Sequence, residues 1–260
     1  MEIELPDELS MLRDMVRRFV DEELIPIEGK SLDGQKLKPE IEARLTARCK
    51  ELGLWQIDVP EELGGQGLGV LGRSIVWSEL GRTVALPTRV VRILGPDIRA
   101  PLYALEGEMR ERYLMPAVRG ERESCFAQTE PDAGSDPGAM RTTAVRDGDH
   151  YVINGTKRFI TGADVSDIVI LMAATDRSKG SRGGISCFVF DKDTPGVQAH
   201  DLLSTRSPAR RRGRSCSTTC ASTRATLSAR KAAASASGSA GSAPAASSRA
   251  RVRSAPPDVA

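Results

Sequence analysis

A change in the spacing of apolar residues near residue 123 divides this chain into two kinds of secondary structure. Before it, apolar side chains recur every three or four residues, first as Leu9, Leu12, Met15, Val16, Phe19 and Val20. That period predicts amphipathic helices. After it, short β-branched and aromatic segments are separated by turn pairs such as Asp147-Gly148 and Asn154-Gly155, which are typical of hairpins. The sequence therefore predicts an α+β protein, all-helical first and all-β second.

The two patterns give approximate bounds for each element. Helices are expected at about 7–25, 39–53, 69–80 and 106–118. Strands are expected at about 125–129, 142–146, 151–153, 158–161, 168–173 and 186–190. Because the strands are short and joined by turns, we expect a small antiparallel, barrel-like β domain.

A third kind of sequence begins after Leu203. Residues 205–260 contain eleven Arg or Lys, one acid (Asp258), no aromatic residue and only Leu227, Val252 and Val259 as large aliphatics. Such a segment buries too little apolar surface to offset its ordering entropy, so we expect it to be disordered. Residues 1–204 hold 26 basic and 34 acidic side chains, so the body is mildly acidic and we expect no nucleic-acid partner.

Cysteine and histidine usage indicates neither a metal site nor a disulfide framework. The five cysteines are odd in number and mostly far apart, and the only histidines are His150 and His200. The N-terminus is acidic and lacks the basic start and apolar run of a signal peptide. No stretch of 18 apolar residues could span a membrane. We therefore expect a cytoplasmic protein with reduced cysteines, no bound metal and no membrane partner.

The segment 125–136 carries the strongest functional signal. It begins as a strand and ends as a loop of small and hydroxyl residues, in which Gly134 allows close backbone approach and Ser135 offers a donor to a phosphate oxygen. A surface loop without function would use the same residue types, and composition alone favours that interpretation.

The run from Thr129 to Asp136 reads Thr-Glu-Pro-Asp-Ala-Gly-Ser-Asp, and it resembles a signature of the acyl-CoA dehydrogenase family. Further segments resemble the same family in the right order, at 59–67, 79–83, 112–116 and 154–161. The resemblance covers about 200 residues. It implies an FAD-dependent oxidoreductase of lipid metabolism that dehydrogenates an acyl-CoA thioester between its α and β carbons.

The resemblance also implies roles for particular residues. The stretch Phe126, Ala127, Gln128 and Thr129 lies along the flavin, with Thr129 bonding a polar edge of the isoalloxazine. Ser135 serves the pyrophosphate of FAD and the CoA side of the substrate. In the second flavin segment Phe159, Ile160 and Thr161 bind the cofactor, with Phe159 against the ring system and Thr161 near flavin N5. Many relatives have Trp where Phe159 stands, and the plain alternative for Phe159 is a strand aromatic that faces the core.

One motif competes with this reading. The stretch 67–72 fits the dinucleotide fingerprint G-x-G-x-x-G. A functional instance follows a buried strand and opens a helix, whereas helices are expected on both sides here. The sequence therefore argues against a nicotinamide site.

The resemblance implies a third, helical domain that carries the carboxylate base, completes the acyl pocket and forms the oligomer interface. Nothing after residue 204 matches it, so we assign no catalytic residue in this chain. We expect a helical domain at 1–122, a β domain at 123–204 and a disordered Arg/Ser/Ala-rich tail at 205–260. When Ser228–Ala245 is written in GC-rich codons and read in another frame, it resembles the family's entry into its third domain, which predicts a frameshifted, truncated and inactive product.

Three alternatives remain open from the sequence. The same fold serves flavin-dependent monooxygenases and nitroalkane-type oxidases. The chain could be a non-catalytic fragment or a subunit of a larger assembly. The tail could be a natural linker or nucleic-acid tail, although it lacks aromatic residues for stacking on bases. If the family assignment holds, an electron-transfer flavoprotein is the expected acceptor, and the intact protein is expected to be a homo-oligomer.

Overall fold

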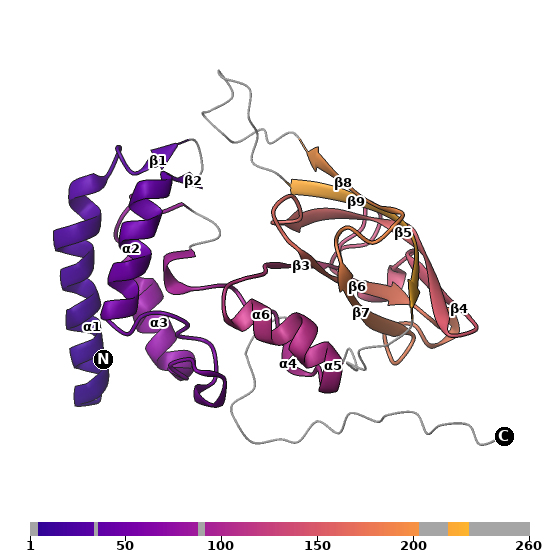
Figure 1. Ribbon diagram of the computed structural model, residues 1–260, viewed down its shortest axis with the longest axis horizontal. Coiled ribbons are helices and arrows are strands. Elements are labelled where there is room, and N and C mark those ends of the chain that lie inside the picture. Colours follow the sequence, from indigo (N-terminus) through magenta and orange to yellow (C-terminus); the bar gives the residue numbers. More distant parts are fainter. Residues whose placement is uncertain (1–4, 34–35, 88–91, 203–217, 229–260) are drawn as a thin grey trace. The chain divides into compact units, whose positions relative to one another are not determined.

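The structure is a computed structural model that describes residues 5–33, 36–87, 92–202 and 218–228 of the 260. The chain forms two compact units that divide after Asp97 (Figure 1). The boundary between domains that the sequence predicts, between residues 122 and 123, remains a prediction. In the structure, the last helical segment belongs to the same compact unit as the sheet.

The first unit is helical, as predicted. Its main helices are α1 (Asp7–Phe19), α2 (Pro39–Glu51) and α3 (Gly69–Leu80). Helix α1 continues as a π turn, η1 (Val20–Leu24), and a 3-10 turn, η2 (Ile25–Ile27). Shorter elements are β1 (Leu32–Asp33) paired with β2 (Lys36–Leu37), and the 3-10 turns η3 (Glu61–Leu63) and η4 (Arg92–Leu94).

The apolar stripes read from the sequence face a common core in this unit. Val16 and Phe19 of α1, Leu45 and Cys49 of α2 and Val76 of α3 are all buried in one cluster. The element just before α3 is the 3-10 turn η3 and not a strand, so the stretch 67–72 lacks the context of a dinucleotide site, as predicted.

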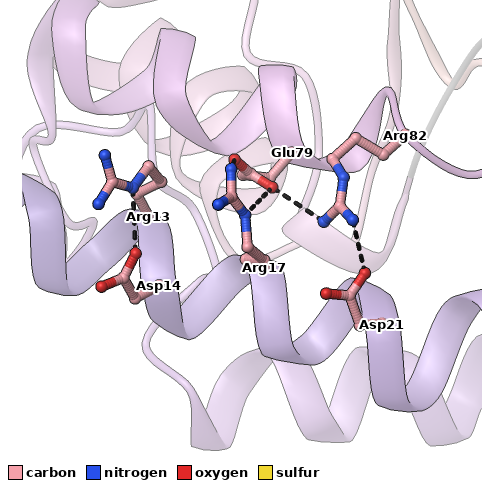
Figure 2. Close-up of polar contacts among 6 residues, drawn as sticks. All are labelled: Arg13, Asp14, Arg17, Asp21, Glu79 and Arg82. Carbon is pink, nitrogen blue, oxygen red and sulfur yellow. Dashed lines mark hydrogen bonds and ion pairs between the residues drawn. The ribbon is translucent and has the colours of Figure 1, made fainter.

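A charged network joins α1 to α3 beside this core (Figure 2). The Glu79 carboxylate, whose side chain is 6% exposed, accepts hydrogen bonds from Nη2 of Arg17 at 2.8 Å and Nη1 of Arg82 at 3.1 Å. Arg82 donates in turn to Asp21 at 2.7 Å. Arg13 and Asp14 form a separate pair on the surface of α1.

The second unit begins with helical turns and continues as a sheet. The helical part comprises α4 (Ala100–Tyr103), α5 (Gly107–Met109), the π turn η5 (Arg110–Leu114) and α6 (Met115–Val118). Asp191, at the end of β7 (Ile185–Asp191), holds the segment that leads from these helices to the sheet. Its carboxylate accepts hydrogen bonds from Arg112 and from Nη2 of Arg122, the latter at 2.6 Å.

The sheet consists of β3 (Ser124–Ala127), β4 (Thr143–Asp147), β5 (His150–Thr161), β6 (Ile168–Ala174), β7 (Ile185–Asp191), β8 (Val197–Leu202) and β9 (Thr218–Ser228). The strand order is β3-β6-β4-β5-β9-β8, and β7 pairs with β6 (Figure 1). Two 3-10 turns lie in its loops, η6 (Pro137–Ala139) and η7 (Arg177–Lys179).

The prediction of an antiparallel barrel was wrong. Strand β6 pairs in parallel with β3 and with β4, so the sheet is mixed, and within the described residues it does not close into a barrel. The cause is that turn residues indicate which consecutive strands form hairpins but carry no information on pairing between distant strands. Parallel pairs need a long crossover, which here spans the residues between β3 and β6.

The hairpin turn predicted at Asn154-Gly155 was also wrong, because β5 runs through both residues without a turn. Asn154 pairs with Thr143 of β4 inside the ladder. A Cβ on Gly155 would meet Oγ1 of Thr142 at 2.2 Å, so glycine is needed here for close packing against the neighbouring strand. The turn predicted at Asp147-Gly148 is confirmed, since Asp147 pairs with His150 and Gly148 has a φ of 58°.

The expectation of disorder after residue 204 was wrong for Thr218–Ser228, which form β9 between β5 and β8. Counting only large aliphatic residues overlooked the four threonines of this segment, which are β-branched and favour strands. A strand placed between two partners also satisfies its backbone groups on both edges. The rest of the expected tail, 205–217 and 229–260, lies outside the described residues.

Candidate functional site

The two segments expected to bind a flavin lie beside each other in the second unit. The backbone N–H of Arg158 in β5 donates to the carbonyl oxygen of Thr129, just beyond β3, at 2.8 Å. The Nζ of Lys157 donates to the carbonyl oxygen of Gln128 at 3.0 Å. Residues about 30 positions apart in sequence are thus held in direct contact by one hydrogen bond between backbone groups and one from a side chain to the backbone.

The side chains of these segments divide into an inward and an outward set. Cys125 and Ala127 of β3 are buried, whereas Phe126 is half-buried, as a two-residue alternation requires. In the second segment Ile160 is buried and Thr161 is half-buried. Ala127 and Ile160 both belong to the core cluster of the sheet, so only their backbone atoms are available to a ligand.

Phe159 projects from the sheet, and its interpretation as a core aromatic was wrong. Its side chain is 57% exposed, and its backbone has a φ of 60°, in the left-handed region that is unfavourable for a bulky residue. The register between β5 and β9 shifts between Lys157 and Ile160, as in a β-bulge that redirects side chains. The guanidinium carbon of Arg158 lies 4.7 Å from the centre of the Phe159 ring. An exposed aromatic ring in a strained backbone is typical of a ligand site.

Three polar side chains in the two segments can still form hydrogen bonds with a ligand. The side chains of Gln128, Thr129 and Thr161 are half-buried, and within the described part of the chain they form no hydrogen bonds. Half-buried polar groups without protein partners are suited to a polar ligand edge. This set, together with the apolar faces of Phe126 and Phe159, fits a flat heteroaromatic ring such as a flavin.

Ser135 is placed differently from the other candidate residues. It lies in the loop after the turn closed by the N–H of Glu130 and the carbonyl of Ala133 (2.8 Å), and its side chain is exposed. No hydrogen bond within the described residues joins it to Thr129 or Thr161. The exposed Ser135 hydroxyl is free to donate to a phosphate oxygen, but within the described residues no hydrogen bond links Ser135 to the residues expected to bind the flavin ring.

Sequence reasoning missed the residues that hold the two segments together. Lys157 is fully buried, and its Nζ lies 2.8 Å from Oε1 of Glu130, which is 5% exposed. The same carboxylate accepts hydrogen bonds from the backbone N–H groups of Arg141 (2.6 Å) and Thr142 (2.9 Å). The sequence did indicate that Lys157 is buried, because it lies four residues after Ile153 in β5 and its side chain therefore points to the same inner face of the sheet.

Opposing effects act on the two charges of this pair. Burial alone would raise the pKa of Glu130, but hydrogen bonds from Lys157, Thr142 and Arg141 hold that pKa below its ordinary value. Burial lowers the pKa of Lys157 against the attraction of Glu130. Glu130 is therefore ionised at neutral pH and acts as the central acceptor of the cluster.

Two domain models of one protein family match this chain. The N-terminal domain of acyl-CoA dehydrogenase matches residues 6–121, and the middle domain of acyl-CoA dehydrogenase matches residues 125–208. Both matches agree with the segments identified in the sequence, and the site geometry falls within the middle-domain match. The chain belongs to the acyl-CoA dehydrogenase family.

Individual relatives support the same assignment. The chain is 38% identical over 213 residues to (R)-benzylsuccinyl-CoA dehydrogenase of Thauera aromatica, covering 76% of this chain and 52% of the relative. It is 37% identical over 209 residues to the mitochondrial short-chain specific acyl-CoA dehydrogenase of Mus musculus, covering 79% and 50%. The chain thus spans about half the length of these curated relatives.

Solved structures resemble it as well. A glutaryl-CoA dehydrogenase from Mycobacterium smegmatis in complex with FADH2 superposes with a TM-score of 0.64 at 26% identity, covering 86% of this chain and 54% of that one. Among the described residues, no helix is long and apolar enough to cross a membrane.

Proposed function

We propose that this chain provides the flavin-binding part of an FAD-dependent acyl-CoA dehydrogenase. The observation that carries the proposal is the hydrogen bond between the Arg158 N–H and the Thr129 carbonyl, which holds the segment of Thr129 beside the segment that contains the exposed Phe159 ring. Each of these residues lies in a segment that the family resemblance assigns to the flavin. The exposed aromatic ring and the polar groups without hydrogen-bond partners support this proposal, because a heteroaromatic cofactor is bound through apolar contact with its face and hydrogen bonds to its polar edge.

In this proposal the chain's own residues bind and orient the cofactor. Thr129 and Thr161 donate from their hydroxyls to polar atoms of the ring edge, and Phe126 and Phe159 cover its apolar surface. Gln128, Ala127 and Ile160 line the site, the last two through their backbone. The exposed Ser135 hydroxyl donates to a phosphate oxygen on the pyrophosphate and CoA side. When bound, FAD supplies the acceptor for the hydride that leaves the acyl β carbon.

The base that removes the α proton has no candidate in this chain under the proposal. Family resemblance assigns it to a carboxylate in a third domain, whereas the sequence after residue 204 holds only Asp258 as an acid. We therefore propose that these 260 residues alone do not dehydrogenate acyl-CoA, since loss of a general base lowers rates by about two to four orders of magnitude. Turnover of a saturated acyl-CoA with an artificial electron acceptor would contradict this. A frameshift within the codons after Leu203 is the proposed cause, and resequencing that region tests it.

The partners of the intact protein are part of the same proposal. They are an acyl-CoA substrate, an electron-transfer flavoprotein as acceptor, and further copies of the chain in a homo-oligomer. The proposed domains are 1–122 and 123–204.

The test is a titration of the full chain with FAD, followed by quenching of flavin fluorescence. The unaltered chain should bind, and Phe159→Ala should weaken binding about tenfold, because an aromatic face contributes through both its area and its stacking. Val145→Ala is the matched control, since Val145 is also an exposed apolar residue (62%) on the same sheet. Its affinity should equal that of the unaltered chain. Equal affinity in Phe159→Ala, or no binding by the unaltered chain, would refute the proposal.

A further inference from the structure

A fully buried lysine in β5 has no role in the function proposed so far. Lys157 is 0% exposed, the largest fully buried side chain of the described residues. Burying a charge is costly unless it is paired and hydrogen-bonded. A hydrophobic residue at this inward position would pack with less cost, so the arrangement around Lys157 needs an explanation beyond stability.

Both side-chain hydrogen bonds of Lys157 reach the first candidate flavin segment. Its ammonium group donates to the carbonyl of Gln128 at 3.0 Å and to Oε1 of Glu130 at 2.8 Å. These two acceptors flank Thr129, whose own carbonyl accepts from the N–H of Arg158 at 2.8 Å. Three consecutive residues of one segment are thus bound by two consecutive residues of the other.

Glu130 extends this connection to a third segment. Its carboxylate also accepts from the backbone N–H groups of Arg141 (2.6 Å) and Thr142 (2.9 Å), which precede β4. Thr142 lies against the Cα of Gly155, where an added Cβ would be 2.2 Å from its Oγ1. The strand that carries Lys157 is therefore held on both sides of the lysine.

Charged hydrogen bonds with little exposure fix geometry more strictly than apolar packing, because they depend on direction as well as distance. Thr129 follows Gln128 directly, and Phe159 lies two residues after Lys157. The lysine and the glutamate therefore set the distance between Thr129 and Phe159, the two residues proposed to face the ligand.

We propose that Glu130 and Lys157 are positioning residues, which clamp the segments of Thr129 and Phe159 at the separation that the flavin ring requires. This inference rests on the proposed function. It assigns no contact between either residue and the cofactor. It predicts that removing the clamp weakens flavin binding even in a variant that stays folded.

The experiment uses the full chain and two measurements. Hydrogen exchange at the Arg158 amide reports the contact with Thr129 without any ligand, and FAD titration reports the site. Lys157→Met keeps side-chain length but removes both donated bonds. We expect exchange at Arg158 to accelerate at least about tenfold and the Kd for FAD to rise about tenfold, as loss of a charged hydrogen bond allows.

The double variant Glu130→Gln with Lys157→Met guards against failure of the single variant to fold. It removes both charges and leaves an amide oxygen for the Thr142 N–H, so its melting temperature should stay nearer to that of the unaltered chain. Its FAD affinity should remain low, because the clamp is still absent. Arg122→Met is the control, since it breaks the 2.6 Å contact with Asp191 in the same unit and touches neither segment. It should leave Arg158 exchange and FAD affinity unchanged.

The outcomes separate this inference from the function on which it rests. Unchanged exchange at Arg158 in the folded Lys157 variants overturns the positioning role. Equal losses of FAD affinity in Arg122→Met and Lys157→Met also overturn it, because general destabilisation then explains both. Failure of the unaltered chain to take up FAD overturns the proposed function itself.

Discussion

Nη2 of Arg17 lies 2.8 Å from Oε1 of Glu79, a pairing that joins α1 to α3 through a carboxylate only 6% exposed (Figure 2). Glu79 also accepts from Arg82, so one buried anion receives hydrogen bonds from two cations. The two guanidinium groups remain partly in solvent, with side chains 50% and 39% exposed. The arrangement therefore stabilises the helical unit without trapping an unpaired charge.

Glu79→Ala should lower the free energy of unfolding of the helical unit by about 1–2 kcal/mol, because charged hydrogen bonds to a buried acceptor are lost while solvent still screens the arginines. Urea unfolding followed by circular dichroism measures this. Asp14→Ala is the control, since the Arg13–Asp14 pair is exposed at 38% and 61% and should contribute nothing measurable. Equal effects of the two variants would contradict the prediction.

The contribution of Glu79 should depend on pH in a defined direction. Hydrogen bonding from Arg17 holds the pKa of Glu79 below its ordinary value of 4.5. A depressed pKa in the folded state stabilises the protein above pH 4.5 and loses that effect as pH falls through the folded value. The stability difference between the unaltered chain and Glu79→Gln should therefore be constant near neutral pH and shrink below about pH 4.5. A difference that grows on acidification would refute the assignment.

Gly155→Ala should be strongly destabilising, although alanine normally favours a strand over glycine. The new Cβ would lie 2.2 Å from Oγ1 and 2.5 Å from Cβ of Thr142, and overpacking of this kind costs about 1–3 kcal/mol. Gly134→Ala is the matched control, because nothing lies within 4 Å of its added Cβ. Thermal melts should show a clear loss for the first variant and none for the second.

The buried thiols should be unreactive in the folded chain. Burial raises the pKa of Cys49 and of Cys187 to about 12, and it raises the pKa of Cys125. A shift of that size from the ordinary 9.0 lowers the thiolate fraction about a thousandfold at neutral pH for Cys49 and Cys187. Alkylation followed by peptide mass spectrometry should find these three residues unmodified until denaturant is added. Rapid labelling of any of them in the native chain would show that its segment opens.

Local pattern was sufficient for most elements. The helix expected at 69–80 is α3, with the same bounds, and the predicted strand at 168–173 is β6 to within a residue. These succeed because a repeating apolar pattern records which side of an element faces a core. The prediction of two strands in place of β5 was wrong for the opposite reason, since Gly155 is explained by contact with Thr142, which directly precedes β4, and not by a turn.

The sequence by itself determined the family, the helical and β parts, and the identity of the residues expected at the flavin site, because motifs and periodicity are written in consecutive residues. Only the tertiary structure decided that β3 and β6 run parallel and that the backbone of Phe159 is left-handed, so that its side chain projects from the sheet. It also decided that Lys157 reaches Glu130 across 27 positions. The physical reason is that strand pairing and the burial of a charge depend on residues distant in the chain. Which residues become neighbours is decided by core packing and by the need to satisfy buried hydrogen-bonding groups.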